Sequence, residues 1–309
     1  MTQEPRVVVG VDGSDAALAA VRFGAMEARR TGCAMRLVHV MPETVPLVPM
    51  LPLISSETFA EAGGRVLRQA RHEAERTAGR DLAVSTHLRS GARVHGIVAE
   101  GEDARMVVLG HRDRSGLGRI LTGSTSTGVA TRAHCEVVSV PDTWAPEHAG
   151  SGVVVGVDHL EHSAEVLAAA FEAASTRGER LTVVHAWRLP SPYDDIIVER
   201  AQGDDWRSGV TRELAVAVAS FRSDHPEVDV ELDVRHQFPT AALLGAAEGA
   251  ALLVVGRRGP GAPFGFHLGG VARAMMTHAH CPVAVVPMRP RPGERLELDL
   301  VAGEVAPQP

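Results

Sequence analysis

Glycine, arginine and hydroxyl side chains gather in residues 110–125, GHRDRSGLGRILTGST, directly after the apolar run at residues 106–109. A short strand that leads into such a loop is where α/β proteins hold phosphate groups. Glycine lets the backbone approach an anion closely, arginine is a permanently charged planar donor, and a helix start offers free amide groups. The stretch therefore predicts a phosphate-binding loop. The residues expected to bind are Gly110, Arg112, Gly116, Gly123, Ser124 and Thr125.

All 31 basic side chains of the 309-residue chain are arginines, because the sequence contains no lysine. This excludes a Walker-type lysine, a Schiff-base lysine and a Ser–Lys catalytic dyad. The sequence also lacks a nucleophile elbow, a His-Glu-x-x-His pair and a kinase signature. His159 and His162 have no third ligand near them in the sequence, so we expect no metal site. These observations favour binding over catalysis.

The net charge of −7 and the scattered arginines argue against a nucleic-acid partner and against a membrane-binding patch. Cys33, Cys135 and Cys281 are too few and too far apart for a disulfide framework or a zinc site. The first residues offer no signal peptide, and no apolar run approaches the ~18 residues of a membrane span. We therefore expect a cytoplasmic protein.

The sequence contains the same unit twice, with corresponding residues 146 positions apart. The pairs at this offset include Gly10 and Gly156, Asp12 and Asp158, His39 and His185, Gly110 and Gly256, Gly123 and Gly269, and Cys135 and Cys281. An unchanged offset across so many positions indicates a tandem duplication. We expect one domain at residues 1–149, a second at residues 150–289, and a disordered tail at residues 290–309, which is rich in proline and charge.

Strand-like and helix-like patterns alternate in each unit. In the first, the predicted strands are residues 6–11, 35–40, 82–88, 106–109 and 136–140. The predicted helices are residues 14–30, 57–78, 94–102 and 124–132. Such alternation predicts the α/β class, with two tandem doubly wound domains, each a five-stranded and mostly parallel sheet flanked by helices. We expect the last strands of the two units to pair within the chain, since exposed sheet edges need covering, and a homodimer is a further possibility.

The motifs at these positions resemble those of the universal stress protein family, over about residues 5–289. The family's nucleotide signature is glycine, two residues, glycine, nine residues, glycine, then serine or threonine. The first unit matches with Gly110, Gly123 and Ser124, and the second with Gly256, Gly259 and Gly269. The opening VVVGVDGS, the strand LVHV and the closing HCPVAVVP are also similar to the family. The resemblance implies an adenine nucleotide alpha hydrolase-like fold that binds ATP, with or without Mg²⁺.

The resemblance also implies roles for individual residues. Asp12 and Asp158 would contact the ribose or adenine side, and the backbone at Val40 and Ala186 would meet the adenine. The glycine loops would hold the triphosphate. The remaining residues included in the predicted sites are Gly10 and Asp113 in the first unit and Gly156, Gly256, Arg258, Gly259, Gly269 and Gly270 in the second.

Both units depart from the family signature. Asp113 stands at the second signature glycine of the first unit, where a carboxylate repels phosphate unless Mg²⁺ lies between them. In the second unit Gly270 replaces the hydroxyl residue, and His159 and Leu160 replace the glycine and serine that follow Asp12 in the first. A simpler interpretation of Asp12 is a turn residue after a strand. Neither unit therefore matches the full signature.

The leading hypothesis is an ATP-binding stress-response regulator without efficient catalysis. One alternative is a slow ATPase in which Asp113 or Asp12 holds Mg²⁺. Another is an interaction module whose degenerate sites are partly empty, with the apolar segment at residues 45–54 as a docking surface. His39 and His185 lie inside apolar strands, and we expect them to be packed, hydrogen-bonded core residues. Between the two units, Ser124 favours nucleotide binding in the first.

Overall fold

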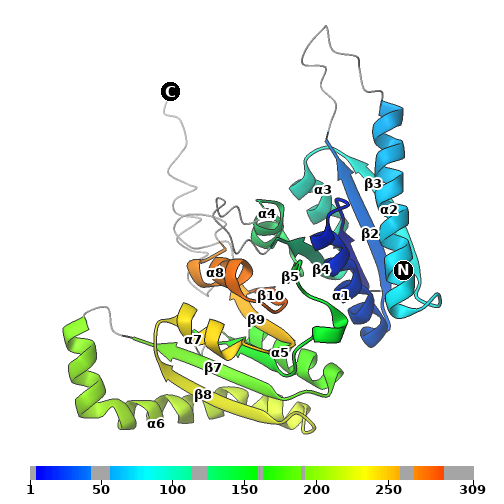
Figure 1. Ribbon diagram of the computed structural model, residues 1–309. Coiled ribbons are helices and arrows are strands. Elements are labelled where there is room, and N and C mark those ends of the chain that lie inside the picture. The colour runs from blue at the N-terminus through cyan, green and yellow to red at the C-terminus, as the bar shows by residue number, and fades with distance from the viewer. Residues whose placement is uncertain are drawn as a thin grey trace, which may run out of the picture. The chain divides into compact units, whose positions relative to one another are not determined.

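The computed structural model describes residues 5–42, 56–112, 124–158, 160, 163–188, 192–257 and 268–288. Strands and helices alternate through both repeats, and the predicted α/β class is confirmed (Figure 1). Several predicted features lie outside the described residues. They are Asp113, Gly116, Gly123, Arg258, Gly259, His159, His162, the apolar segment at residues 45–54 and the tail at residues 290–309.

The first repeat consists of five strands and four helices within the described residues. They are β1 (Arg6–Gly10), α1 (Asp15–Thr31), β2 (Ala34–Met41), α2 (Ser56–Ala78), β3 (Val84–Ser90), α3 (Arg93–Glu100), β4 (Ala104–His111), α4 (Ser124–Arg132) and β5 (Glu136–Pro141). The strands lie in the order β3-β2-β1-β4-β5 and are paired in parallel. The chain leaves β1 toward β2 on one side and returns to β4 on the other, so the strand order reverses beside β1.

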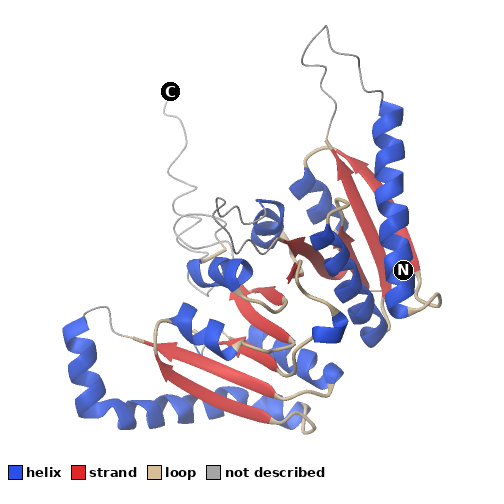
Figure 2. Cartoon of the chain, viewed as in Figure 1, coloured by secondary structure: helices blue, strands red, loops and turns tan. Residues whose placement is uncertain are grey.

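Helices cover both faces of this sheet (Figure 2). Gly24 of α1 packs against Val7 and Val9, whereas the next position along β1, Gly10, faces Ile97 of α3. Alternate residues of a strand point to opposite faces, so α1 and α3 lie on opposite sides of the sheet. Val7, Val8 and Val9 are fully buried, as a continuous valine run predicts for a central parallel strand.

The second repeat has the same order of elements, preceded by a short 3-10 helix at Pro146–His148. They are β6 (Val153–Gly156), α5 (Ala164–Arg177), β7 (Leu181–Trp187), α6 (Pro192–Asp224), β8 (Val230–His236), α7 (Pro239–Ala246), β9 (Leu252–Arg257), α8 (Gly270–His278) and β10 (Val283–Pro287). β6, β7 and β8 are paired in parallel. The bounds of β8 and α7 equal those of β3 and α3 shifted by the repeat offset, so the duplication extends to single residues.

The chain divides into two compact units that do not follow the repeat boundary strictly. The first unit contains the first repeat together with Ala247–Leu253 and Met276–Val285. Within this unit β5 pairs with β10 in antiparallel orientation, and Ser139 lies opposite Val283. The expected pairing of the two last strands is confirmed, and β10 covers the edge of the first repeat's sheet. Among the described residues, no helix is both long and apolar enough to cross a membrane.

Candidate functional site

A cavity of about 260 Å³ lies at the carboxyl ends of β1, β2 and β4, beside the point where the strand order reverses. Ligands of open α/β sheets bind at this place. Five residues predicted from the sequence line it together: Gly10, Asp12, Val40, Gly110 and Thr125. The ten other lining residues were not among the predicted site residues, and they include Ser14, His39, Arg93, Ile97 and Ser126. The sequence therefore predicted part of the wall of this cavity.

Asp12 is held by the turn that connects β1 to α1. Its Oδ1 accepts hydrogen bonds from the Ser14 hydroxyl at 2.6 Å and from the Ser14 amide at 3.0 Å. Burial alone would raise the pKa of Asp12. The two bonds from Ser14 and the positive charges of Arg112 and Arg93 outweigh that effect and hold the pKa below its usual value. Asp12 is therefore an ionised hydrogen-bond acceptor at neutral pH.

Ser14 has a second role as the N-cap of α1. Its Oγ accepts a hydrogen bond from the amide of Ala17 at 3.2 Å, which is the usual bond of a serine at a helix N-cap. The residue between Asp12 and Ser14 is Gly13, whose φ of 85° lies in the left-handed region that favours glycine. One short turn thus begins a helix and orients a carboxylate.

Gly110 lies inside β4 and does not form a turn. A Cβ at this position would lie 2.1 Å from the carbonyl oxygen of Ala16, so only glycine lets β4 approach the first turn of α1. The carbonyl of Gly110 accepts a hydrogen bond from the Ser126 hydroxyl at 3.2 Å, which connects β4 to α4. Gly110 was expected to let the backbone approach an anion, and in this structure the neighbour that approaches it closely is helix α1. Gly110 also lines the cavity.

His39 lines the cavity from β2, with its Nδ1 2.7 Å from the carbonyl oxygen of Val11. A carbonyl can only accept, so Nδ1 is the donor in this bond. His185 makes the same contact in the second repeat, where its Nδ1 lies 3.0 Å from the carbonyl oxygen of Val157. The prediction that both histidines are hydrogen-bonded is confirmed. His39 was expected to be a core residue, but it also lines the cavity, because β2 ends there.

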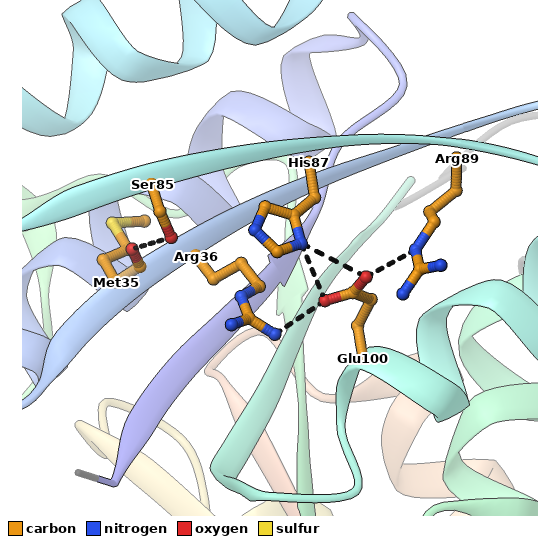
Figure 3. A network of polar contacts seen from close by, with 6 residues as sticks. All are labelled: Met35, Arg36, Ser85, His87, Arg89 and Glu100. Carbon is orange, nitrogen blue, oxygen red and sulfur yellow. Dashed lines mark hydrogen bonds and ion pairs between the residues drawn. The ribbon is translucent and has the colours of Figure 1, made fainter. Parts of the chain in front are cut away.

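One wall of the cavity belongs to α3, which contributes Arg93 and Ile97. At the other end of this helix Glu100 is buried, with 4% of the residue exposed. Its carboxylate accepts from Arg36 Nη1 at 2.7 Å and Arg89 Nε at 2.5 Å, and it lies 3.1 Å from His87 Nδ1 (Figure 3). Burial alone would raise the pKa of Glu100, but these partners outweigh it and lower the pKa. Side chains of β2 and β3 thus attach α3 to the sheet.

The corresponding edge of the second repeat is built differently. Asp158 is exposed, as Asp12 is, but Leu160 stands where Ser14 stands in the first repeat. α5 begins only at Ala164, whereas α1 begins at Asp15, which is three residues earlier in the repeat. A Cβ at Gly256 would lie 2.4 Å from Met288 Sδ, so a flexible side chain lies where the first repeat places helix backbone. The aspartate of the second repeat therefore lacks the serine turn of the first.

Other predicted residues of the second repeat are in the elements expected of them. Ala186 lies near the end of β7, and Gly156 ends β6 against Leu243 of α7. Gly269 has a φ of 78° just before Gly270 begins α8. In the first repeat Ser124 begins α4, although Thr125 and Ser126, not Ser124, line the cavity. Arg112 follows β4 directly, and its charge reaches Asp12.

A parallel sheet with helices on both faces and a cavity at the strand switch defines a doubly wound α/β protein. The model of the Universal stress protein family matches residues 5–141 and 152–287. The chain belongs to the universal stress protein family, with one family domain in each repeat.

Relatives of similar length support this assignment. A universal stress protein of Mycobacterium tuberculosis is 34% identical over 291 residues, covering 90% of this chain and 96% of that protein. One of Mycolicibacterium smegmatis is 32% identical over 290 residues, covering 92% of this chain and 97% of that protein. The crystal structure of a universal stress protein from Archaeoglobus fulgidus superposes with a TM-score of 0.71 at 20% identity, over 92% of this chain and 99% of that one. The tandem arrangement is thus shared across the full lengths compared.

Proposed function

We propose that the first repeat binds an adenine nucleotide, ATP in particular, and that binding rather than turnover is its activity. The observation that carries this proposal is one cavity in which Asp12, Val40, Gly110 and Thr125 meet. The resemblance to the family assigns nucleotide contacts to Asp12, Val40 and Gly110, and the phosphate-loop pattern predicts one at Thr125. The nucleotide-bound and nucleotide-free forms of the protein would differ at the surface. A partner protein that binds only one of these forms would thereby respond to the nucleotide concentration.

The chemistry of the lining fits the parts of a nucleotide. An ionised Asp12 can accept hydrogen bonds from the ribose hydroxyls, and the Val40 backbone with Ile97 offers an apolar, hydrogen-bonding edge for adenine. Thr125 and Ser126 lie in the first turn of α4, whose amides and dipole favour phosphate. A volume of about 260 Å³ suits the nucleoside, so the outer phosphates would extend beyond the cavity.

The state of the polar groups supports binding without efficient hydrolysis. A carboxylate with a lowered pKa is a weak general base, and the Oδ1 of Asp12 is already bonded to Ser14. The described residues include no group of three or more His, Cys, Asp or Glu that could hold a metal. A Mg²⁺ ion that arrives with ATP would take most of its ligands from phosphates and water, as is common for this ion.

The test is a calorimetric titration of the full chain with ATP, AMP and GTP, together with mass spectrometry of ligands released from the purified protein. We expect ATP and AMP to bind and GTP to bind at least tenfold more weakly. Absence of binding, or equal affinity for ATP and GTP, would contradict the proposal. ADP formation from Mg-ATP is followed in parallel, and several turnovers per minute would contradict the non-catalytic part of it.

A further inference from the structure

The wall that α3 forms differs between the two repeats. Arg93 is the first residue of α3, and the corresponding first residue of α7 is Pro239. Arg93 is exposed and lines the cavity together with Gly110, Thr125 and Ser126. Of the described residues that line this cavity, it is the one with a permanent positive charge.

Contacts with the described residues do not explain Arg93. In the described part of the chain it has no hydrogen bond and no ion pair, and its charge acts on Asp12 from a distance. A cation at the first position of a helix is repelled by the positive end of the helix dipole, whereas proline is favoured there. The second repeat has the favoured residue and the first has the disfavoured one. Arg93 therefore does not serve the stability of α3.

The helix that carries Arg93 is firmly attached at its other end. Glu100 bonds to Arg36 and Arg89 and contacts His87, so strands β2 and β3 both hold α3 in place (Figure 3). The second repeat has Ala246 at the position of Glu100.

The second repeat attaches α7 in a different way. Its Arg235, at the position of Arg89, pairs with Asp233 at 2.7 Å and donates to the carbonyl of Ala242 at 3.0 Å. The carboxylate is thus on the strand and not on the helix. In the first repeat the contacts of Glu100 anchor α3, the helix that carries Arg93. Only the side chain of Arg93 therefore has to change its position when a ligand binds.

We infer that Arg93 binds the phosphate group of the nucleotide in the first repeat and that the second repeat, with Pro239, has no such group. This rests on the proposed function and adds to it a residue that sets the preference for charged nucleotides over nucleosides. Ionised Asp12 would otherwise repel a phosphate in the same cavity. Arg93 and Arg112 both place positive charge near Asp12, which opposes this repulsion.

The experiment compares wild type, Arg93→Gln, Arg93→Lys and Arg71→Gln by titration with adenosine, AMP and ATP. Arg71 is a matched control, because its side chain is 51% exposed on α2 and does not line the cavity. Since hydrogen bonds to charged groups are the strong ones, we expect Arg93→Gln to weaken AMP and ATP about tenfold or more and to leave adenosine unchanged. Arg93→Lys should recover part of the loss, and Arg71→Gln should bind as wild type. If both repeats bind nucleotide, the Arg93 substitutions should change the fitted affinity of only one of the two sites.

The outcomes separate the inference from the proposed function. Wild type that binds none of the three ligands contradicts the proposed function itself. Wild-type binding with unchanged AMP and ATP affinity in Arg93→Gln overturns the inference alone. An equal loss for adenosine and ATP also overturns it, because a phosphate contact cannot affect a nucleoside. Thermal unfolding of each variant confirms that the fold is retained, as expected for an exposed side chain.

Discussion

Ser14 performs two tasks at the scale of a single residue, and both can be tested. Replacing it with alanine removes the cap of α1 and both side-chain contacts, so we expect a loss of about 1 kcal/mol in the free energy of unfolding. Without the hydroxyl bond, the pKa of Asp12 should rise toward its usual value. Denaturant unfolding measures the first effect, and NMR titration of Asp12 measures the second. Ser14→Thr is the control, since threonine keeps the hydroxyl, and a loss as large as in Ser14→Ala would refute the capping role.

Gly110 and Gly256 occupy equivalent positions but face different neighbours, so they form a matched pair of substitutions. Alanine at 110 would press its Cβ against the Ala16 carbonyl of α1, and the backbone must shift. Alanine at 256 would meet the thioether of Met288, which can move aside. We expect Gly110→Ala to cost about 1–3 kcal/mol and Gly256→Ala clearly less. Urea unfolding of both variants decides, and equal losses would disprove the packing explanation.

At the scale of elements, the Glu100 cluster connects α3 to two strands. Glu100→Gln leaves the guanidinium groups of Arg36 and Arg89 without their counter-charge, although both can still reach water. We expect a loss of about 1–3 kcal/mol at pH 7, less than for a fully buried pair. Chemical denaturation of wild type and variant measures this loss. Glu75→Gln on α2, whose partner Arg71 is exposed, should change stability little.

The same cluster predicts a dependence on pH with a definite sign. The pKa of Glu100 is lowered from 4.5 on folding, so the ionised carboxylate stabilises the fold at pH values above 4.5. This contribution declines as the pH falls through the folded pKa. The stability difference between wild type and Glu100→Gln should therefore be largest near pH 7 and shrink below pH 4.5. A difference that grows on acidification would contradict the lowered pKa.

The sequence predicted the elements wherever burial leaves a strong pattern. The valine runs of β1, β4 and β5 identify strands that are buried on both faces, because helices cover both faces of a parallel sheet. The predicted bounds of β3 were wrong by two residues: the sequence predicted residues 82–88, and the strand is Val84–Ser90. β3 lies at the edge of the sheet, and most of its side chains are partly or fully exposed. A half-solvated strand has little hydrophobic pattern to define its ends.

The site residues were predictable where they recur in the repeat or in the family signature. Asp12, Val40 and Gly110 were found in this way, whereas Arg93 was missed, because it lies one residue before the predicted helix and its counterpart is Pro239. Ser126 was missed because only the folded helix α4 shows which of its hydroxyl groups faces the cavity. Position along the chain does not reveal such an orientation.

At the scale of the whole molecule, the repeats are unequal, and the nucleotide stoichiometry should show it. The second repeat has Leu160 for Ser14, Pro239 for Arg93 and Gly270 for Ser124. We expect one tight nucleotide per chain, bound in the first repeat. Calorimetry should find a stoichiometry near one for wild type and for Asp158→Asn, and loss of tight binding for Asp12→Asn. Retained tight binding in Asp12→Asn with loss in Asp158→Asn would assign the site to the second repeat instead.

The pairing of β5 with β10 also has a consequence for the order in which the molecule can fold during synthesis. Ser139 of β5 lies opposite Val283, so the ribosome must add 144 more residues after Ser139 before its partner exists. Until then the β5 edge of the nascent sheet presents unpaired backbone groups, which is the kind of surface that recruits foreign strands. Pairing of such distant segments is slow, because a long loop must close before any contact compensates for it. A chain stalled after residue 150 should therefore engage chaperones more strongly than the full-length chain.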